Sequence, residues 1–388
     1  MTEAALKNKN DMTNIPFIDL NAQRARIEKE IDKAVLGAVH GGAYIMGPQV
    51  KQLEKDLAEF AGAKHCISCS SGTDSLLMFL MSQNLKQNDV VFVPDFTFIA
   101  TAEVVSMVGA QTFAVDVEKD TFNLDPQELQ NAVLSAKEKG LNPVGVIPVD
   151  LFGHPADYEA IKKISDEHGL WIMADSAQGF GGSLNGKKVG QWGDITSTSF
   201  FPAKPLGCYG DGGALFTDND ELADVLKSLR VHGKGTDKYD NVRVGLNARL
   251  DTVQAAILIE KLKIFPDELI ARQNVADRYN NALSDDVKTP ALAKGATSAW
   301  AQYTLILTGN INRADFSAKC KENGVPTAVY YPLPISRQTA YKDVNVLDHG
   351  NPVSEFLSKR VISLPMHPYL DNETQDYIIQ VVKNALVS

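Results

Sequence analysis

Segments of strand length alternate with segments of helix length through the first half of the chain, and this alternation limits the possible folds more than any other feature. The apolar runs of strand length cover 90–93, 111–115, 144–150 and 170–174. The amphipathic patterns of helix length cover 27–39, 50–60, 101–108 and 158–168. Strands joined by crossover helices pair in parallel. The sequence therefore predicts an α/β fold around a mostly parallel sheet, with ligand-binding residues at strand ends.

The C-terminal part has a different pattern, in which one long helix precedes mixed elements. A helical pattern runs from about 250 to 278 and contains Pro266, where we expect an interruption. Beyond it, 302–308 is strand-like, whereas 313–323 and 373–386 are helical. This mixture predicts a second, smaller α+β unit.

These patterns divide the chain into three parts. With 388 residues, of which 44% are hydrophobic, the chain is long enough for two packed domains. We expect a polar N-terminal extension over 1–15, a large domain with the N-terminal helices over 16–265, and a small C-terminal domain over 266–388.

Composition excludes several classes of function. The formal net charge of −10 argues against a nucleic-acid-binding surface. No apolar stretch approaches the length of a membrane span, and the first 14 residues are polar, so we expect no membrane insertion and no secretion signal. We therefore expect a cytoplasmic protein.

The four cysteines predict neither a disulfide framework nor a metal site. Cys66 and Cys69 have the spacing of a redox or zinc motif, but no second pair or histidine cluster completes it. Cys208 and Cys320 are isolated in the sequence. We expect all four to be packed core residues, and we expect no metal.

Lys204 is the first candidate for covalent chemistry. It follows a Phe-Phe-Pro-Ala segment and precedes a turn rich in glycine. Apolar surroundings lower the pKa of an amine and favour the neutral form, which condenses with an aldehyde. The alternative is a lysine at a strand end whose amine reaches solvent.

Asp175 is a possible partner for this chemistry. It ends the apolar run Trp-Ile-Met-Ala, as a carboxylate does at the carboxyl end of a buried strand. Such an acid can hold the proton on the ring nitrogen of pyridoxal phosphate, and the protonated ring withdraws electrons. Gln178 could donate to the phenolic oxygen of that cofactor. A helix cap or a salt bridge for Asp175, and a solvated Gln178, are the alternatives.

A third candidate site lies where a short strand, a turn of small residues and an apolar helix follow one another. Amides at a helix start, together with hydroxyls of Ser71 and Thr73, form a typical phosphate site. Ser199, which lies five positions before Lys204, can supply another hydroxyl. The alternative is an ordinary N-cap at Ser71 or Thr73.

The order of these residues resembles that of aspartate-aminotransferase-like enzymes, and more narrowly the DegT/StrS family of sugar-nucleotide aminotransferases. The resemblance runs from about Pro16 to the C-terminus and also includes motifs outside the three candidate sites. These motifs are Ala-Tyr-Ile-Met-Gly-Pro from Ala43, Phe-Thr-Phe-Ile-Ala-Thr from Phe96, Val-Asp-Leu-Phe-Gly from Val149, Asn-Ala-Arg-Leu-Asp from Asn247 and Tyr-Pro-Leu-Pro from Tyr331. The resemblance implies the type I fold of pyridoxal-phosphate enzymes, with a mostly parallel seven-stranded sheet and a smaller α+β C-terminal domain.

The resemblance also implies roles for residues that bind the cofactor, pyridoxal 5′-phosphate. Lys204 corresponds to the Schiff-base lysine, Asp175 to the acid at the ring nitrogen and Gln178 to the amide near the phenolic oxygen. The implied phosphate ligands are Gly72, Thr73 and Ser199. Phe98, in preference to Phe96, corresponds to the aromatic residue that covers the ring. Asn247 corresponds to an asparagine that reaches the phosphate across a homodimer interface.

The lysine loop is similar to that of members that aminate C3 of a nucleotide-linked hexose. The implied substrates are L-glutamate and a 3-keto UDP-sugar, UDP-2-acetamido-2-deoxy-3-oxo-D-glucuronate, whose product enters surface polysaccharides such as lipopolysaccharide O-antigen. The residues expected to contact substrate are Tyr44, Arg249, Tyr330, Tyr331 and His367. An ion pair with Asp251 is the alternative for Arg249. Amination of C3 or C4 of another, dTDP- or GDP-linked keto sugar, and a non-catalytic regulator that binds the cofactor, are the alternative functions.

Overall fold

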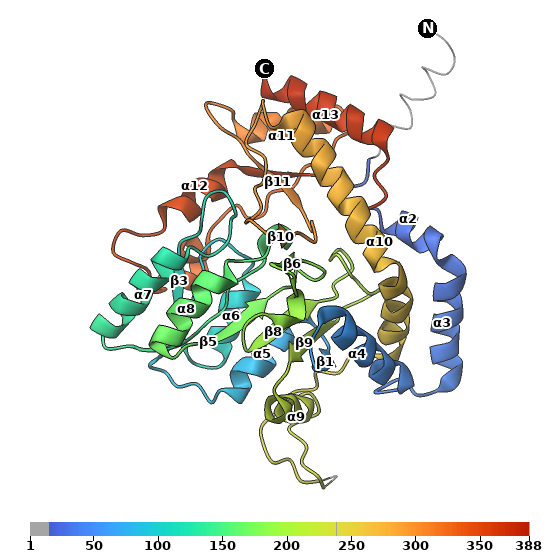
Figure 1. Ribbon diagram of the computed structural model, residues 1–388, viewed down its shortest axis with the longest axis vertical. Coiled ribbons are helices and arrows are strands. Elements are labelled where there is room, and N and C mark those ends of the chain that lie inside the picture. Colours follow the sequence, from blue (N-terminus) through green and yellow to red (C-terminus); the bar gives the residue numbers. More distant parts are fainter. Residues whose placement is uncertain (1–14, 238, 388) are drawn as a thin grey trace.

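A seven-stranded sheet forms the centre of the computed structural model, which describes residues 15–237 and 239–387 (Figure 1). The strand order is β1-β9-β8-β5-β4-β2-β3. The bounds are β1 His65–Cys69, β2 Asp89–Pro94, β3 Gln111–Val115, β4 Asn142–Val146, β5 Trp171–Asp175, β8 Ile195–Ser199 and β9 Gly213–Thr217. Only the pairs that include β9 are antiparallel. The predicted α/β fold with a mostly parallel seven-stranded sheet is confirmed.

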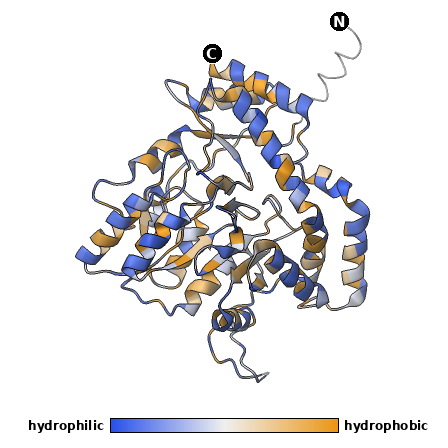
Figure 2. Ribbon diagram, viewed as in Figure 1, coloured by the Kyte–Doolittle hydropathy of each residue, from blue (hydrophilic) through white to orange (hydrophobic). Residues whose placement is uncertain are grey.

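Helices cover both faces of this sheet. One face packs against α4 (Pro48–Ala61), α7 (Pro126–Glu138), α8 (Tyr158–His168) and the first part of α10 (Thr252–Leu283). The other face packs against α5 (Gly72–Ser82), α6 (Ala100–Met107) and α9 (Asp220–Leu229). Figure 2 shows that outer helices such as α7 and α8 carry both hydrophilic and hydrophobic residues. Such mixed helices bury one side and leave the other in water.

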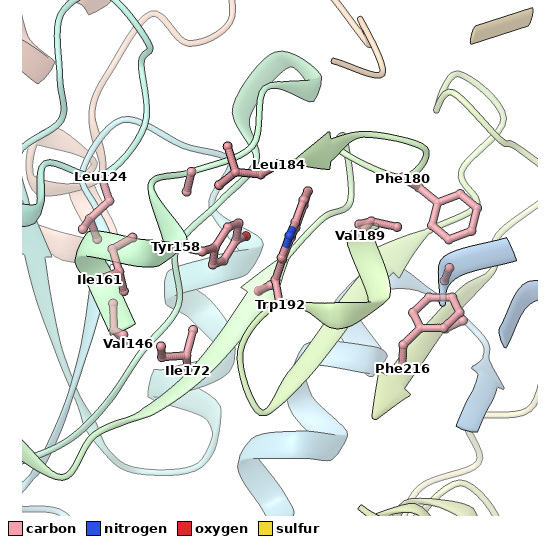
Figure 3. Packing of buried hydrophobic residues seen from close by; sticks show 14 of the residues in the cluster. Leu124, Val146, Tyr158, Ile161, Ile172, Phe180, Leu184, Val189, Trp192 and Phe216 are labelled. Carbon is pink, nitrogen blue, oxygen red and sulfur yellow. The ribbon is translucent and has the colours of Figure 1, made fainter. Parts of the chain in front are cut away.

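The strands are apolar on both faces because each face is covered. In β2, Val90 and Phe92 belong to one hydrophobic cluster, whereas Val91 and Val93 belong to the other. Successive side chains of a strand point to opposite faces, so a strand buried on both sides reads as a continuous apolar run. Figure 3 shows part of the first cluster, in which the rings of Tyr158 and Trp192 lie face to face.

Several elements differ in their bounds from the sequence prediction. The expected strand 144–150 is shorter, because β4 ends at Val146 and Val149 makes only an isolated bridge to Asp175. The expected helix 27–39 corresponds to α3 (Glu28–Gly41), and a short helix that was not predicted, α2 (Leu20–Arg26), precedes it. Ile27 between them has a non-helical φ of −129° and packs its buried side chain with Ile257 of α10. This contact explains the break, which the apolar pattern alone does not show.

The predicted interruption at Pro266 is wrong. Helix α10 runs unbroken from Thr252 to Leu283 with Pro266 inside it. Proline removes one hydrogen bond of a helix, so packing must hold the helix together there. Phe265 lies in the core beneath the sheet, and Tyr279 lies in the core of the C-terminal part. The helix therefore crosses from one hydrophobic core to the other without a break.

The C-terminal part is built on a two-stranded sheet and three helices. The strands are β11 (Tyr303–Ile306) and β12 (Val361–Leu364), and the helices are α11 (Arg313–Glu322), α12 (Pro352–Arg360) and α13 (Asn372–Leu386). These elements, except α12, share one buried cluster with the second half of α10. In Figure 1 they form the upper part of the molecule, above the large sheet.

The remaining elements are short. A second small sheet has the order β10-β6-β7. Its strands are β6 (Ser183–Leu184), β7 (Lys187–Lys188) and β10 (Ala296–Thr297), and the 3-10 helices are η1 (Leu151–Gly153), η2 (Val189–Gln191), η3 (Ile335–Arg337) and η4 (Thr339–Tyr341). The expected N-terminal extension over 1–15 lies almost entirely outside the described residues.

We predict that Gly145→Ala destabilises the protein. Gly145 of β4 faces Trp171 of β5, and an added Cβ would lie 2.1 Å from the indole ring. The ring packs edge-on against Phe79, so its displacement disturbs the core and should cost about 1–3 kcal/mol. A lower melting temperature measures this loss.

Gly37→Ala in α3 is the matched control. No atom lies within 4 Å of a Cβ added at Gly37, and alanine is the better helix former by about 0.5–1 kcal/mol. Its melting temperature should stay equal or rise. An equal fall for both variants would contradict the packing argument.

Candidate active site

A cavity of about 460 Å³ lies at the carboxyl ends of β5 and β8, beside the start of α5. This is the edge at which α/β sheets bind ligands. The residues that line it are Ile18, Ser71, Gly72, Thr73, Leu76, Thr97, Phe98, Ala100, Val149, Asp175, Ala177, Gln178, Ser199, Phe201, Ala203, Lys204, Asp211, Gln302, Tyr330 and Tyr331. The three candidate sites of the sequence therefore meet in one cavity.

Lys204 lies in a closed loop that projects from the end of β8. Phe200 pairs its N–H with the Gly212 carbonyl at 2.7 Å and accepts at its own carbonyl from the Cys208 N–H at 2.8 Å, so the loop returns to its starting point. The lysine is half-buried. Burial lowers the pKa of its amine, and the charge of Asp175 opposes this shift. A larger neutral fraction makes the amine a better nucleophile and base.

Helix α10 holds the base of this loop. The buried Lys261 donates to the Gly207 carbonyl at 2.6 Å and lies over the Tyr209 ring. Gln254 accepts from the Tyr209 N–H at 2.9 Å and donates to its carbonyl at 3.3 Å. Both ends of the Gly207–Tyr209 segment are thus attached to one helix, so the position of the loop depends on α10.

Asp175 is the last residue of β5, and its side chain is only 4% exposed. Thr101 donates to one carboxylate oxygen at 2.8 Å, and the Ala177 N–H donates to the other at 3.1 Å. Burial raises the pKa of the carboxyl, whereas these two donors and Lys204 lower it. Within residues 15–237 and 239–387, this carboxylate caps no helix and forms no salt bridge, so the two structural alternatives do not describe it.

The amide of Gln178 has a defined orientation. Its Oε1 accepts from the Phe152 N–H at 2.7 Å. The Nε2 group therefore acts as the donor, and it donates to the Tyr331 hydroxyl at 3.1 Å. Phe152 adopts a left-handed backbone conformation (φ 60°), which is uncommon for a residue other than glycine. The two bonds hold the amide of Gln178 in place where this residue lines the cavity.

The turn before α5 has the features of an anion site. Ser71 is the N-cap of α5 and accepts from the Asp74 N–H at 3.0 Å, which agrees with the structural alternative for this residue. Gly72 and Thr73 are the first two helical residues, whose N–H groups have no acceptor within the helix. A Cβ at Gly72 would lie 2.7 Å from the Ser199 Cβ. Only glycine allows Ser199 to approach the turn this closely.

The two candidate aromatic residues occupy different places. Phe98 is 52% exposed, lines the cavity and has its ring centroid 6.1 Å from that of Tyr331. Phe96 is fully buried in a hydrophobic cluster with Phe122. Of the two, Phe98 is therefore the one that a ligand in the cavity can contact.

Three predicted residues, Tyr44, Asn247 and Arg249, lie outside the cavity of this chain, on two neighbouring segments. Asn247 is exposed and accepts from the Nε–H of the half-buried Arg249 at 2.8 Å. Tyr44 is 55% exposed and accepts at its carbonyl from the Thr252 N–H. No ion pair joins Arg249 to Asp251 among the described residues.

His367 does not take the place that was predicted for it. It is only 2% exposed, does not line the cavity, and packs near Pro16. Burial lowers the pKa of its imidazole to about 4, and neither ring nitrogen has a partner within the described chain. His367 therefore does not form part of the cavity wall, contrary to its predicted place among the substrate contacts.

Sequence reasoning missed several residues of the cavity wall. Ile18, Thr97, Asp211 and Gln302 line the cavity but were not candidates. Thr101, which does not line the cavity but donates to Asp175, was known only as part of a motif. Thr101 is the second residue of α6, the helix that follows β2. A search of the segment after this strand for polar side chains could have found it. Gln302 comes from the C-terminal part, 124 positions beyond Gln178, and no local signal places it here.

Comparisons with known proteins agree with this geometry. The model of the DegT/DnrJ/EryC1/StrS aminotransferase family matches residues 25–383. A Pseudomonas aeruginosa protein, UDP-2-acetamido-2-deoxy-3-oxo-D-glucuronate aminotransferase, is 43% identical over 95% of this chain and 100% of its own length. A DegT DnrJ EryC1 StrS aminotransferase from Brucella abortus is 49% identical and superposes with a TM-score of 0.94 over 96% of this chain and 99% of its own. NtdA from Bacillus subtilis, solved with the bound cofactor PMP, is 27% identical, with a TM-score of 0.85 over 97% and 86%.

A lysine that faces a buried carboxylate at the strand ends of this fold defines a pyridoxal-phosphate-dependent aminotransferase. More narrowly, the chain belongs to the DegT/DnrJ/EryC1/StrS aminotransferase family. The expected enzyme class and cofactor are thereby confirmed. The residues present fit the cofactor, because the free amides at Gly72 and Thr73 suit a phosphate and the buried Asp175 suits a protonated ring nitrogen.

The described residues contain neither a membrane-spanning helix nor a group of side chains that could hold a metal. Within residues 15–237 and 239–387, no helix is both long and apolar enough to cross a bilayer. The same residues contain no group of three or more side chains that could hold a metal ion. All four cysteines are free and buried, as predicted.

We predict that Thr101→Val lowers turnover. The hydroxyl is one of two donors to the Asp175 carboxylate among the described residues. Its loss should raise the pKa of that carboxyl further and so reduce the fraction of Asp175 that is ionised. A hydrogen bond to a charged group contributes about 1.5–3 kcal/mol, which corresponds to about tenfold or more in kcat.

Thr112→Val is the matched control, because Thr112 is a buried threonine whose hydroxyl has no partner within the described residues. Steady-state kinetics and absorbance titration of the cofactor should separate the two variants. Equal kcat in wild type and Thr101→Val would show that Asp175 does not depend on this donor.

Proposed function

We propose that this protein transfers the amino group of L-glutamate to C3 of a 3-keto UDP-sugar, UDP-2-acetamido-2-deoxy-3-oxo-D-glucuronate. The full-length similarity to the Pseudomonas aeruginosa enzyme supports this substrate. The observation that carries the proposal is the cavity that brings Lys204, Asp175 and the Gly72 turn together. The product is a 3-amino sugar nucleotide for surface polysaccharide such as lipopolysaccharide O-antigen, made in the cytoplasm.

The proposed mechanism gives each cavity residue one task. Bound pyridoxal 5′-phosphate supplies the aldehyde that receives the amino group and a ring that withdraws electrons. Asp175 holds a proton at the ring nitrogen, and Gln178 donates its Nε2–H to the phenolic oxygen. The Lys204 amine removes the proton from the α-carbon of glutamate and returns a proton at C3 of the sugar in the second half-reaction. Its lowered pKa favours the neutral base that this step needs.

Positioning is assigned to the remaining residues. Gly72 and Thr73 bind the phosphate through backbone N–H groups, and the Ser199 hydroxyl joins them. Phe98 covers one face of the ring. Tyr330 and Tyr331, which line the cavity on the side of the C-terminal part, contact the sugar.

The anionic sugar nucleotide requires positive charge that the cavity of one chain does not provide, since Lys204 is its only cationic side chain among the described lining residues. We therefore assign Tyr44, Asn247 and Arg249 to the active site of the partner in a homodimer. A guanidinium binds phosphate or carboxylate oxygens in a bidentate manner. An acidic chain can gather such donors at a two-fold interface.

Two other functions are the alternatives. Amination at C3 or C4 of a dTDP- or GDP-linked keto sugar uses the same cofactor residues, so only the substrate separates it from our proposal. A regulator that binds the cofactor without turnover does not need the paired Lys204 and Asp175. Their shared burial and mutual charge effect favour an enzyme.

We expect UDP-linked 3-keto sugars that carry a C6 carboxylate to be aminated fastest in a panel of UDP-, dTDP- and GDP-linked keto sugars with glutamate. Mass spectrometry of the products measures the outcome, and borohydride reduction followed by peptide mapping should place the cofactor on Lys204. Lys204→Ala should bind the cofactor without turnover. A label on another lysine would refute the mechanism, and preference for a dTDP-sugar would refute only the substrate.

We also expect subunit complementation. Lys204→Ala and Asn247→Asp/Arg249→Ala chains should each be inactive, whereas a mixed dimer has one site with both lesions and one site with neither. Random assortment of equal amounts should restore up to about a quarter of wild-type activity. Failure to restore activity after verified subunit exchange would show that each chain builds its site alone.

A further inference from the structure

A second buried carboxyl, that of Asp150, lies directly behind Asp175. Asp150 has no exposed surface. One of its oxygens accepts from the Tyr158 hydroxyl at 2.8 Å and from the Ala156 N–H at 3.1 Å, and the other accepts from the Ser176 hydroxyl. Three donors satisfy this buried carboxylate, so its position is well defined. The mechanism above assigns it no role.

Asp150 fills the inside of the turn that carries Asp175 and Gln178. Its N–H donates to the Asp175 carbonyl at 3.0 Å, and the Ser176 hydroxyl next to Asp175 bonds to its carboxylate. Gly179 closes the turn with an N–H bond to the Ser176 carbonyl. A Cβ at Gly179 would lie 2.5 Å from the Asp150 Cβ, so the turn is wrapped tightly around this side chain.

The residues that follow Asp150 hold the other end of the same turn. Helix η1 begins at Leu151, and the Phe152 N–H within it binds the Gln178 amide oxygen. Asp150 and Phe152 therefore contact the turn at Ser176 and at Gln178. Together with the bond from the Asp150 N–H to the Asp175 carbonyl, these contacts hold both ends of the segment that carries Asp175 and Gln178.

The hydroxyl of Tyr158 is itself held in place from behind. The Tyr158 ring stacks on Trp192 with centroids 4.8 Å apart and an interplanar angle of 19°, and Figure 3 shows the two rings face to face. Both side chains are almost completely buried. Stacking leaves the hydroxyl little freedom, so its bond to Asp150 has a fixed direction.

We propose that Asp150 is a positioning residue for the 175–178 turn, and that its ionised form strengthens the negative potential at Asp175. This inference rests on the proposed role of Asp175 at the cofactor nitrogen. Asp150 does not line the cavity, so it acts through Asp175 and Gln178 and not by contact with a ligand.

The charge of Asp150 changes near neutral pH. Burial raises the pKa of its carboxyl to about 7, although the bonds from Ser176, Tyr158 and Ala156 lower it, and repulsion by Asp175 adds to the rise. The titratable groups that face it are Tyr158 from α8 and Asp175 from β5, and Asp175 in turn faces Lys204. As pH falls through about 7, Asp150 takes up a proton, and its contribution to the negative potential around Asp175 is lost.

The same titration makes the stability of the folded protein depend on pH. The folded pKa lies above the ordinary carboxyl value of 3.8, so the folded protein binds more protons than the unfolded chain between about pH 4 and 7. Stability from this group therefore falls as pH rises through that window. Asp150→Asn removes the effect, so its melting temperature relative to wild type should improve between pH 5 and pH 8 in protein without cofactor.

Three variants of the full-length holoenzyme test the proposal. Each variant changes one residue of the hydrogen-bonded group of Asp150, Ser176 and Tyr158. Asp150→Asn removes the charge, Ser176→Ala removes one donor and Tyr158→Phe removes another. Tyr303→Phe is the matched control, because Tyr303 is a buried tyrosine that donates to Asn280 at 2.6 Å in the other core. The readouts are the glutamate half-reaction, the pH titration of the cofactor absorbance and the melting temperature.

For Asp150→Asn we expect kcat to fall about tenfold, the KM for glutamate to stay within about twofold, and the wild-type absorbance change near pH 7 to disappear. Ser176→Ala and Tyr158→Phe should keep this change but move it to higher pH, because each loses a donor that favours the charged carboxylate. Tyr303→Phe should alter neither kinetics nor titration.

An unchanged kcat and an unchanged titration in Asp150→Asn would overturn the proposal. If that variant does not fold, an unshifted titration in both hydroxyl variants overturns it equally. Failure of the wild type to react with glutamate, or a borohydride label away from Lys204, would instead refute the proposed function. The two failures are therefore distinguishable.

Discussion

The buried carboxylate of Asp175 is the feature on which the arrangement of the site depends. A carboxylate at this depth is unstable unless donors and an opposite charge surround it. Thr101 from α6, the Ala177 N–H and the amine of Lys204 meet this need from three different segments. These segments must be close and rigid, and the sheet brings them together because the carboxyl ends of its parallel strands share one edge.

Helix α10 connects the parts that surround this edge. Near its start it holds the lysine loop through Gln254 and Lys261, and its second half lies in the C-terminal core that adjoins Tyr330 and Gln302. The segment before it carries Asn247 and Arg249. A continuous helix through Pro266 is therefore more than a spacer. It couples the position of the lysine loop to the segment that we assign to the partner's site.

Elements with strong local signals were predicted well. The strand 111–115 and the helix 158–168 have the predicted bounds, and the helix has an aspartate N-cap and a glycine C-cap. Lys204, Asp175, Gln178 and Gly72 were predicted from motifs and meet in one cavity. The short helix α2 before Ile27 and the intact helix at Pro266 were not predicted. Both depend on side-chain packing against distant segments, and packing overrides local propensity.

The sequence by itself determined the α/β class and the family, and it supplied the candidate cofactor residues, because apolar periodicity and short motifs are local properties. Tertiary structure alone decided which distant groups support them. Thr101 lies 74 positions from Asp175, and Tyr331 lies 153 positions from Gln178. The tertiary structure also placed His367 outside the cavity and Asp150 against the turn that carries Asp175 and Gln178. These contacts depend on strand order and on the path of the chain between strands, which no short segment specifies.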